Sequence, residues 1–485
     1  MARRTHRSMK PDCILLINPN RIQPPIAPLG LEYLAAALEE QGFALELLDL
    51  AWEDDPLAAV RERLRGQRYD AVGISVRNTD DCSYATRDFF LPQVKELVGA
   101  VKSLTESPVI LGGCGFSVMP EAVLSYCGAD YGLAGDGEAA MAELLGALGQ
   151  GRELAGIRGL VYRHGQKIIV NPPATADLTQ LPCLARRDFA DNRRYLIEGG
   201  QAGLETKRGC DRKCIYCADP LAKGRKPRLR PPAHILQEIT NLLAQGIDCF
   251  HLCDAEFNIP EEHAREVCGE IIRAGLGEKI KWYTYASPKP FSRELALLMR
   301  RAGCAGINFG VDSGHPGVLK ALGRDFGPEE IVAAVRASNQ AGLACMLDLL
   351  IGGPQETPET VAATVRLVKH LEVTAIGVAL GVRIYRGTGL AALVEEEGFH
   401  RGNPNLKGRI EGNEDCLEPV FYLSSTLGPE PKALLSGLIG TDPRFFLMAP
   451  ATADQSYNYN QNLRLVEAIR RGYRGAYWHI LRQIG

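Results

Sequence analysis

The sequence lacks several features that would place it in a class directly. No apolar run reaches the roughly 20 residues of a membrane span, and no internal repeat or low-complexity segment is evident. Lys and Arg (55) nearly balance Asp and Glu (58), so a net charge of −3 does not indicate nucleic acid or an anionic membrane as a partner. The basic start, Met1–Arg7, is followed by Lys10, Pro11 and Asp12, so we expect no secretory signal.

Cysteines are not arranged as a disulfide framework. The chain has 14 of them in 485 residues, scattered except for one tight cluster. This pattern is typical of a reduced protein with a metal site, so we expect a cytoplasmic location. With 46% hydrophobic residues, the chain is long enough for two or three domains.

The tight cluster is Cys210-x3-Cys214-x2-Cys217. Thiolates select iron–sulfur clusters, zinc or copper, but a structural zinc site needs a fourth ligand, and the next candidates are His234 and Cys249. The spacing resembles that of radical S-adenosylmethionine (SAM) enzymes. The resemblance implies a catalytic [4Fe–4S] cluster held by three cysteines, with one iron open to SAM and Tyr216 among the cofactor-binding residues. Buried or zinc-bound cysteines are the alternative.

The first 150 residues alternate between short apolar runs and helical periodicity. Because crossover helices join parallel strands, the pattern predicts a doubly wound, flavodoxin-like α/β domain over 1–150, with its ligand at the carboxyl ends of the strands. The expected strands are Cys13–Asn18, Ala44–Leu50, Ala71–Val76, Val109–Leu111 and Ala129–Leu133. The expected helices are Leu29–Gln41, Pro56–Arg65 and one from Glu138.

Unusual residues follow these strands. Glycines there permit close approach of a ligand, although a glycine-rich loop also cradles other phosphates or simply turns the chain. As a set the segments resemble the cobalamin-binding domain of class B radical SAM enzymes. The resemblance implies that cobalamin binds to Pro28, Leu29, Gly30, Ser75, Arg77, Gly112, Gly113, Gly135, Gly137 and Glu138.

The Asp-x-His-x-x-Gly motif of cobalamin mutases is missing, and His6 is the only histidine before residue 164. The resemblance therefore implies a cobalt without a protein histidine ligand. We suggest that Arg77, just past the third strand, lies under the cobalt. A surface arginine or one that binds a corrin propionamide is the alternative.

Residues 151–200 are predicted to form a connector with one hairpin, since prolines at 172, 173 and 182 disfavour helix. Residues 201–390 again alternate, which indicates a partial (β/α)6 barrel with its site on the carboxyl face. Here the radical SAM resemblance implies SAM contacts from Asp254, Glu256, Asp312, Ser313, Gly352 and Gly353. Alternatively, Asn258 and its neighbours cap a helix over Pro260–Arg273.

Two further regions need an interpretation. The basic stretch Lys223–Arg230 is predicted to be a solvated face, with neutralisation of the SAM carboxylate or of an anionic substrate by one of its arginines as the alternative. Residues 391–485 match no motif. The aromatic residues there predict either core packing or a cap that shapes the substrate pocket: Tyr457, Tyr459, Tyr473, Tyr477 and Trp478.

The resemblance covers residues 13–390 and implies a methyltransferase (EC 2.1.1.-). Such an enzyme moves a methyl group from SAM, by way of methylcobalamin, to a carbon of a small-molecule or peptide substrate. The branch that methylates tryptophan at C2 is a candidate relative. The resemblance also implies an external electron donor such as flavodoxin or ferredoxin, and no membrane or nucleic-acid partner.

Three rival functions stay open. One is a cobalamin-dependent cyclase or oxidase without methyl transfer. A second is a tRNA methylthiotransferase, which would need three more cluster cysteines in the first domain, with Cys13, Cys82 and Cys114 as candidates. A non-catalytic cobalamin carrier or sensor is the third.

Overall fold

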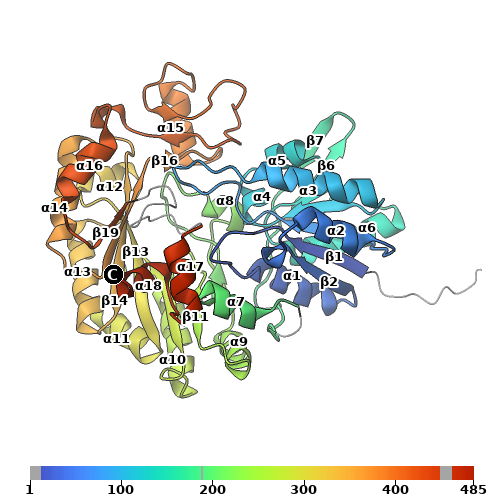
Figure 1. Ribbon diagram of the computed structural model, residues 1–485, viewed down its shortest axis with the longest axis horizontal. Helices are drawn as coiled ribbons and strands as arrows, with labels where there is room; N and C mark the ends of the chain where they lie inside the picture. The colour runs from blue at the N-terminus through green and yellow to red at the C-terminus, as the bar shows by residue number, and fades with distance from the viewer. Residues whose placement is uncertain (1–12, 187–188, 448–460) are drawn as a thin grey trace, which may run out of the picture.

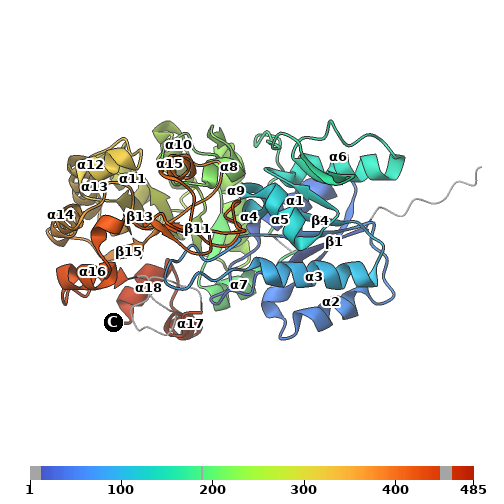
Figure 2. The ribbon, with the colours of Figure 1, turned by 90° about the horizontal axis from the view of Figure 1, so that it is seen from above.

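The computed structural model describes residues 13–186, 189–447 and 461–485. An N-terminal α/β unit lies beside a larger barrel-like unit (Figure 1). The helices α17 (Leu463–Arg470) and α18 (Tyr477–Gln483), near the end of the chain, pack on the barrel side of the junction (Figures 1 and 2). Among the described residues, no helix is long and apolar enough to cross a membrane.

The N-terminal sheet has the strand order β2-β1-β3-β4-β5-β6-β7, and its first five strands are parallel. This order confirms the doubly wound, flavodoxin-like prediction. Ile14–Ile17 are at most 1% exposed, as expected for a strand covered on both faces. The strands are β1 (Cys13–Asn18), β2 (Ala44–Asp49), β3 (Ala71–Ser75), β4 (Val109–Gly112), β5 (Tyr131–Leu133), β6 (Leu160–His164) and β7 (Lys167–Val170).

The predicted hairpin is present as β6 and β7, but it pairs antiparallel with β5. It therefore belongs to the N-terminal sheet, and we propose that this domain extends past residue 150. The helices around the sheet are α1 (Leu29–Glu39), α2 (Pro56–Leu64), α3 (Leu91–Leu104), α4 (Cys114–Val118), α5 (Pro120–Cys127) and α6 (Gly137–Gln150).

The barrel-like sheet has the parallel order β19-β15-β14-β13-β12-β11-β8. The six strands expected of a partial barrel are joined at one edge by β19, which comes from the C-terminal region. The strands are β8 (Ala202–Leu204), β11 (Cys249–Leu252), β12 (Lys281–Ala286), β13 (Cys304–Asp312), β14 (Ala344–Ile351), β15 (Ala375–Leu380) and β19 (Phe445–Leu447).

Helices cover the outside of this sheet, as Figure 2 shows. Several begin with proline at the first helical turn, where its missing N–H costs nothing. They are α9 (Pro232–Ala244), α10 (Glu261–Arg273), α11 (Arg293–Arg301), α12 (Pro316–Ala321), α13 (Pro328–Gln340), α14 (Pro358–Lys369) and α16 (Pro431–Ile439). Two other helices lie elsewhere: α8 (Asp219–Lys223) contacts α4 of the N-terminal unit, and α15 (Gly389–Glu397) packs against a small separate sheet.

Two small sheets and one helix complete the described fold. Asp191 is the N-cap of helix α7 (Asn192–Gly199), and this helix packs against α17. The connector in which it lies was expected to be irregular. A two-stranded sheet pairs β9 (Lys207–Arg208) with β10 (Arg228–Leu229). A three-stranded sheet contains β16 (Val382–Arg383), β17 (Leu406–Lys407) and β18 (Phe421–Tyr422).

Candidate functional site

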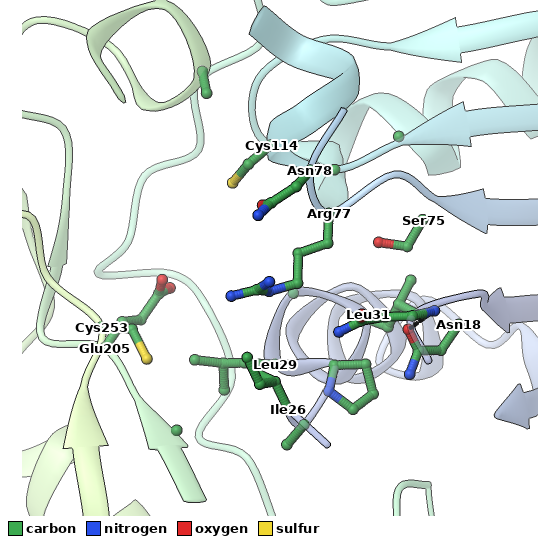
Figure 3. A pocket seen from close by; sticks show the side chains of 18 of the residues that line it. Asn18, Ile26, Leu29, Leu31, Ser75, Arg77, Asn78, Cys114, Glu205 and Cys253 are labelled. Atoms are coloured by element: carbon green, nitrogen blue, oxygen red, sulfur yellow. Dashed lines mark hydrogen bonds between the residues drawn. The ribbon is translucent and has the colours of Figure 1, made fainter. Parts of the chain in front are cut away.

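A cavity of about 860 Å³ opens between the two units. This volume is near the upper end for small-molecule sites, about 300–1,000 Å³. One wall is the carboxyl edge of the N-terminal sheet, and the opposite wall is the barrel interior (Figure 3). Eleven residues predicted to bind a cofactor line it: Pro28, Leu29, Gly30, Ser75, Arg77, Gly112, Gly113, Gly135, Gly137, Glu138 and Asp254.

The glycines of this wall serve two different purposes. Gly113 and Gly135 have φ values of +97° and +89°, and a Cβ would lie 2.7 Å and 2.2 Å from the backbone oxygens of Val76 and Ala174. The chain itself requires glycine at these two positions. At Gly30 a Cβ would meet nothing within 4 Å, so the missing side chain there leaves open space for a bound group.

Arg77 extends from the end of β3 into the cavity, toward the side of Glu205 and Cys253 (Figure 3). No hydrogen bond or ion pair to its guanidinium is found within the described part of the chain. Burial raises the pKa of Tyr285 and of Tyr477, and the positive charge of Arg77 opposes that rise in both. The cation therefore faces the aromatic barrel wall across the cavity.

Part of that wall is aromatic, and its residues were not predicted as a set from the sequence. His251 and Tyr285 have ring centroids 5.1 Å apart, and Asn308, Tyr477 and Trp478 also line the space. Burial lowers the pKa of His251 to about 4, so its imidazole is uncharged at neutral pH. Period-2 alternation along the strands could have indicated that His251, Tyr285 and Asn308 point inward.

A second, smaller space of about 170 Å³ is lined by Cys210, Cys214 and Cys217. Among the described residues, no group of three or more His, Cys, Asp and Glu side chains closes on a single metal ion. A cubane is wider than one ion, so thiols grouped around an open space fit a cluster better than zinc. Burial raises the pKa of the Cys210 thiol to about 11 and of the Cys217 thiol to about 12.

Arg324 lines this smaller space and contacts other residues around it, but no role was predicted for it from the sequence. It lies between α12 and α13, where no motif marks it. Its side chain is 5% exposed; Nη1 donates to Cys214 Sγ at 3.0 Å, and Nε lies 2.7 Å from Asp312 Oδ2. Asp312 Oδ2 also accepts a hydrogen bond from Tyr216 at 2.7 Å. The predicted residues Tyr216 and Asp312 are therefore connected to the cysteine loop through one arginine.

Glu256 also lines the cysteine space, 3.5 Å from Arg324. One of its carboxylate oxygens is buried without a partner, and burial raises its pKa despite the nearby Arg324, Arg212 and Lys207. An unpaired buried carboxylate oxygen beside three thiols suits a positively charged group.

The other residues predicted to bind SAM make hydrogen bonds within the protein. The Asp254 carboxylate accepts hydrogen bonds from the backbone N–H groups of Thr206 and Lys207. Ser313 is fully buried, with its hydroxyl 3.0 Å from that of Thr364. The backbone N–H groups of Gly352 and Gly353 donate to the Glu356 carboxylate.

The helix-cap alternative for Asn258 is wrong. The α10 N-cap is Pro260, which makes no side-chain cap. The Asn258 side chain instead bonds the backbone of Ser287 and the carbonyl of Pro290, and so holds the loop after β12.

The solvated-face interpretation of Lys223–Arg230 is correct only for Arg225 and Lys226, which are exposed. Lys223 lines the large cavity, Arg228 pairs with Asp136 across the junction, and Arg230 is fully buried against Glu238 and the Tyr33 hydroxyl. These partners also leave Arg228 and Arg230 unavailable to a SAM carboxylate.

Further buried pairs join the two units. Arg208 lies 2.8 Å from Glu138, a predicted cofactor residue, and 3.0 Å from Asp136. Arg186 pairs with Glu32 on α1 at 2.5 Å.

Cys13, Cys82 and Cys114 do not form a second cluster site. Cys13 begins β1, whereas Cys114 follows β4 at the opposite edge of the sheet. The Cys82 thiol lies 3.0 Å from the Tyr385 hydroxyl. The methylthiotransferase alternative therefore lacks its additional cysteine site within the described residues.

The residues present fit the expected cofactors: an open glycine-lined edge for cobalamin, and three thiols around an open space for a cluster. Family models agree, with a B12 binding domain over residues 20–145 and the radical SAM superfamily over residues 204–368.

Relatives match over nearly the whole chain. A tryptophan 2-C-methyltransferase of Streptomyces laurentii is 30% identical, over 96% of this chain and 95% of the relative. The structure of TsrM, a radical SAM methyltransferase of Kitasatospora setae, with tryptophan and a SAM analogue bound, matches with a TM-score of 0.91 at 32% identity over 97% of each chain. The same enzyme with cobalamin and a [4Fe–4S] cluster matches with a TM-score of 0.89 at 30% identity over 98% of each chain. The chain belongs to the cobalamin-dependent radical SAM methyltransferase family.

Proposed function

We propose that this chain methylates a ring carbon of tryptophan or of a closely related indole. The observation that carries the proposal is the shared cavity, in which the predicted cobalamin-binding edge faces aromatic side chains and a neutral imidazole of the barrel. Such a wall suits a flat aromatic substrate. When bound, cobalamin supplies a cobalt that can accept a methyl group from SAM and pass it on.

The predicted site residues have separate roles in this proposal. Cys210, Cys214 and Cys217 hold the cluster. Glu256 receives a cationic group beside it, such as the SAM ammonium, because one carboxylate oxygen there lacks a partner. Arg324 keeps Cys214 and Asp312 in place through its bonds to both.

Arg77 is proposed to lie against the lower face of the corrin. Support comes from its position at the end of β3, its extension into the cavity and the absence of another partner in the described chain. A guanidinium cannot be deprotonated in a protein and so cannot act as a metal ligand. Arg77 would therefore occupy the space from which a histidine side chain could otherwise coordinate the cobalt.

We also propose that a protein such as flavodoxin or ferredoxin supplies electrons. The three cysteines of the small space are each partly exposed, which suits electron transfer from outside the chain.

The function is tested by anaerobic reconstitution with iron, sulfide and hydroxocobalamin, followed by SAM, tryptophan and a low-potential reductant, because cobalt(III) must be reduced before it can accept a methyl group from SAM. We expect methyltryptophan and an equal amount of S-adenosylhomocysteine, and neither when hydroxocobalamin is omitted. Formation of 5′-deoxyadenosine with no methylated product would instead support the cyclase or oxidase alternative.

A further inference from the structure

Asn308 lies on the inner face of β13 and has one amide atom without a partner. The residue is 5% exposed and lines the large cavity. Its Nδ2 donates to Asp348 Oδ2 at 3.4 Å and faces the sulfur of Met346 at 3.8 Å. Its Oδ1 is buried and accepts no hydrogen bond. A buried acceptor of this kind is costly unless a bound molecule supplies a donor.

The carboxylate of Asp348 fixes which way the amide points. With the amide reversed, Oδ1 would face a carboxylate oxygen and a thioether, both of which are acceptors. Asp348 and Met346 are on β14, which pairs with β13, so both are held by the sheet. The oxygen of Asn308 is therefore held away from β14 and available to the cavity.

The surroundings of this oxygen are aromatic. Tyr285 is the direct partner of Asn308 in the pairing of β12 with β13. Tyr285 is 43% exposed and lines the large cavity, so its exposed face lies toward that space. The His251 ring lies next to it and is neutral. A flat ring placed against these side chains would have one neutral acceptor at its edge.

We propose that Asn308 Oδ1 accepts a hydrogen bond from the ring N–H of the substrate, and that Asp348 is the positioning residue that orients this amide. The proposal rests on the proposed function and names the part of the substrate that the barrel recognises. A ring N–H offers one neutral donor to one neutral acceptor. An ammonium group would bring three donors, whereas Asn308 offers a single unpaired acceptor.

The test compares tryptophan with two analogues on the reconstituted protein without SAM. In 3-benzothienylalanine, sulfur replaces the ring N–H at nearly the same size, and indole-3-propionate lacks the ammonium. Dissociation constants are measured by equilibrium dialysis. The wild type should bind tryptophan about 10-fold more tightly than benzothienylalanine, the factor that corresponds to one net hydrogen bond.

Asn308→Leu should bring that ratio to about 1, because the acceptor is lost while the volume is kept. Asp348→Asn should also lower it, since the amide is then free to turn. Asn339→Leu is the matched control, because it makes the same change on α13, where the amide donates outside the barrel to the Glu372 carbonyl. It should keep the wild-type ratio. Equal iron and cobalamin per chain show that each variant is folded.

An unchanged ratio in both Asn308→Leu and Asp348→Asn would overturn the inference. If Asn308→Leu instead removes the preference for tryptophan over indole-3-propionate, the acceptor serves the ammonium and the ring N–H assignment is wrong. Should Asn308→Leu not fold, Asp348→Asn decides alone. If the wild type binds neither tryptophan nor benzothienylalanine, the proposed function fails and the inference fails with it. If tryptophan is methylated but the ratio of the two dissociation constants is unchanged in the variants, only the inference is overturned.

Discussion

Removal of the Asp80 carboxylate should destabilise the junction between the two units. Asp80 lies on the connection between β3 and α3, which also carries Arg77, and its carboxylate contacts Arg383 of β16. There its Oδ2 lies 3.0 Å from both Nε and Nη2 of Arg383, whose side chain is 4% exposed, while that of Asp80 is 0% exposed. Arg383 also donates to the carbonyl of Cys416 at 2.9 Å.

Asp80→Ala leaves the Arg383 charge buried without its counter-ion. Breaking a buried pair from one side costs about 3–5 kcal/mol. The matched control, Glu467→Ala, removes one partner of the exposed pair with Arg471 (70% and 64% exposed), where about 0.3–0.5 kcal/mol is expected. Urea unfolding of the reconstituted protein gives both values by linear extrapolation.

Two further results follow from the same pair. Asp80→Leu with Arg383→Met should recover much of the lost stability, because an apolar pair of similar volume needs no counter-ion. The absorbance of bound hydroxocobalamin should change in Asp80→Ala, since the loop that carries Arg77 loses its anchor. A loss below about 1 kcal/mol in Asp80→Ala, no larger than in the exposed control, would refute the reasoning.

Three other outcomes are expected. Changing Cys210, Cys214 and Cys217 together to alanine should reduce bound iron from about four atoms per chain to none, and four retained irons would place the cluster elsewhere. The electron paramagnetic resonance spectrum of the Co(II) form should show no nitrogen superhyperfine splitting, and Arg77→His should introduce it if Arg77 lies under the cobalt. Burial lowers the pKa of His251 from the ordinary 6.5 to about 4. As the pH falls, the imidazole is therefore protonated in the unfolded chain before it is protonated in the folded one. The folded state loses stability between pH 6.5 and pH 4 for this reason. His251→Phe should therefore lose less stability than the wild type between pH 7 and pH 5, by about 2 kcal/mol in urea titrations, and equal losses would contradict the buried neutral imidazole.

Local pattern was sufficient for much of the fold. The apolar run Cys13–Asn18 is β1 as predicted, and helices α2 and α6 begin at or next to their expected residues. The hairpin of β6 and β7 was predicted as a hairpin, but its pairing with β5 is a long-range contact that no local pattern encodes. The three-residue strand β19 was missed for the same reason, since only its pairing with β15 makes it a strand.

The parts of the candidate site that belong to a sequence motif could be predicted from the sequence. The cysteines of 210–217 and the glycines after β4 and β5 line the two spaces as expected. Arg324 was missed because it acts from a connection between helices. The basic stretch was misassigned at Arg228 and Arg230 because charge alone does not distinguish a solvated face from a buried interface, and the partners of these two residues in the N-terminal unit are distant in sequence. Tyr457 and Tyr459 lie outside the described residues, whereas Tyr477 and Trp478 both line the cavity and pack against the barrel core.

The fate of the SAM methyl group tests the central claim most directly. The reconstituted protein is given SAM with a deuterated methyl group, tryptophan and a one-electron donor, and the products are analysed by mass spectrometry. We predict that the intact labelled methyl group appears on the indole ring of tryptophan, with one S-adenosylhomocysteine per product, and only when cobalamin is bound. Turnover that yields 5′-deoxyadenosine while tryptophan remains unlabelled would contradict methyl transfer to tryptophan by this chain.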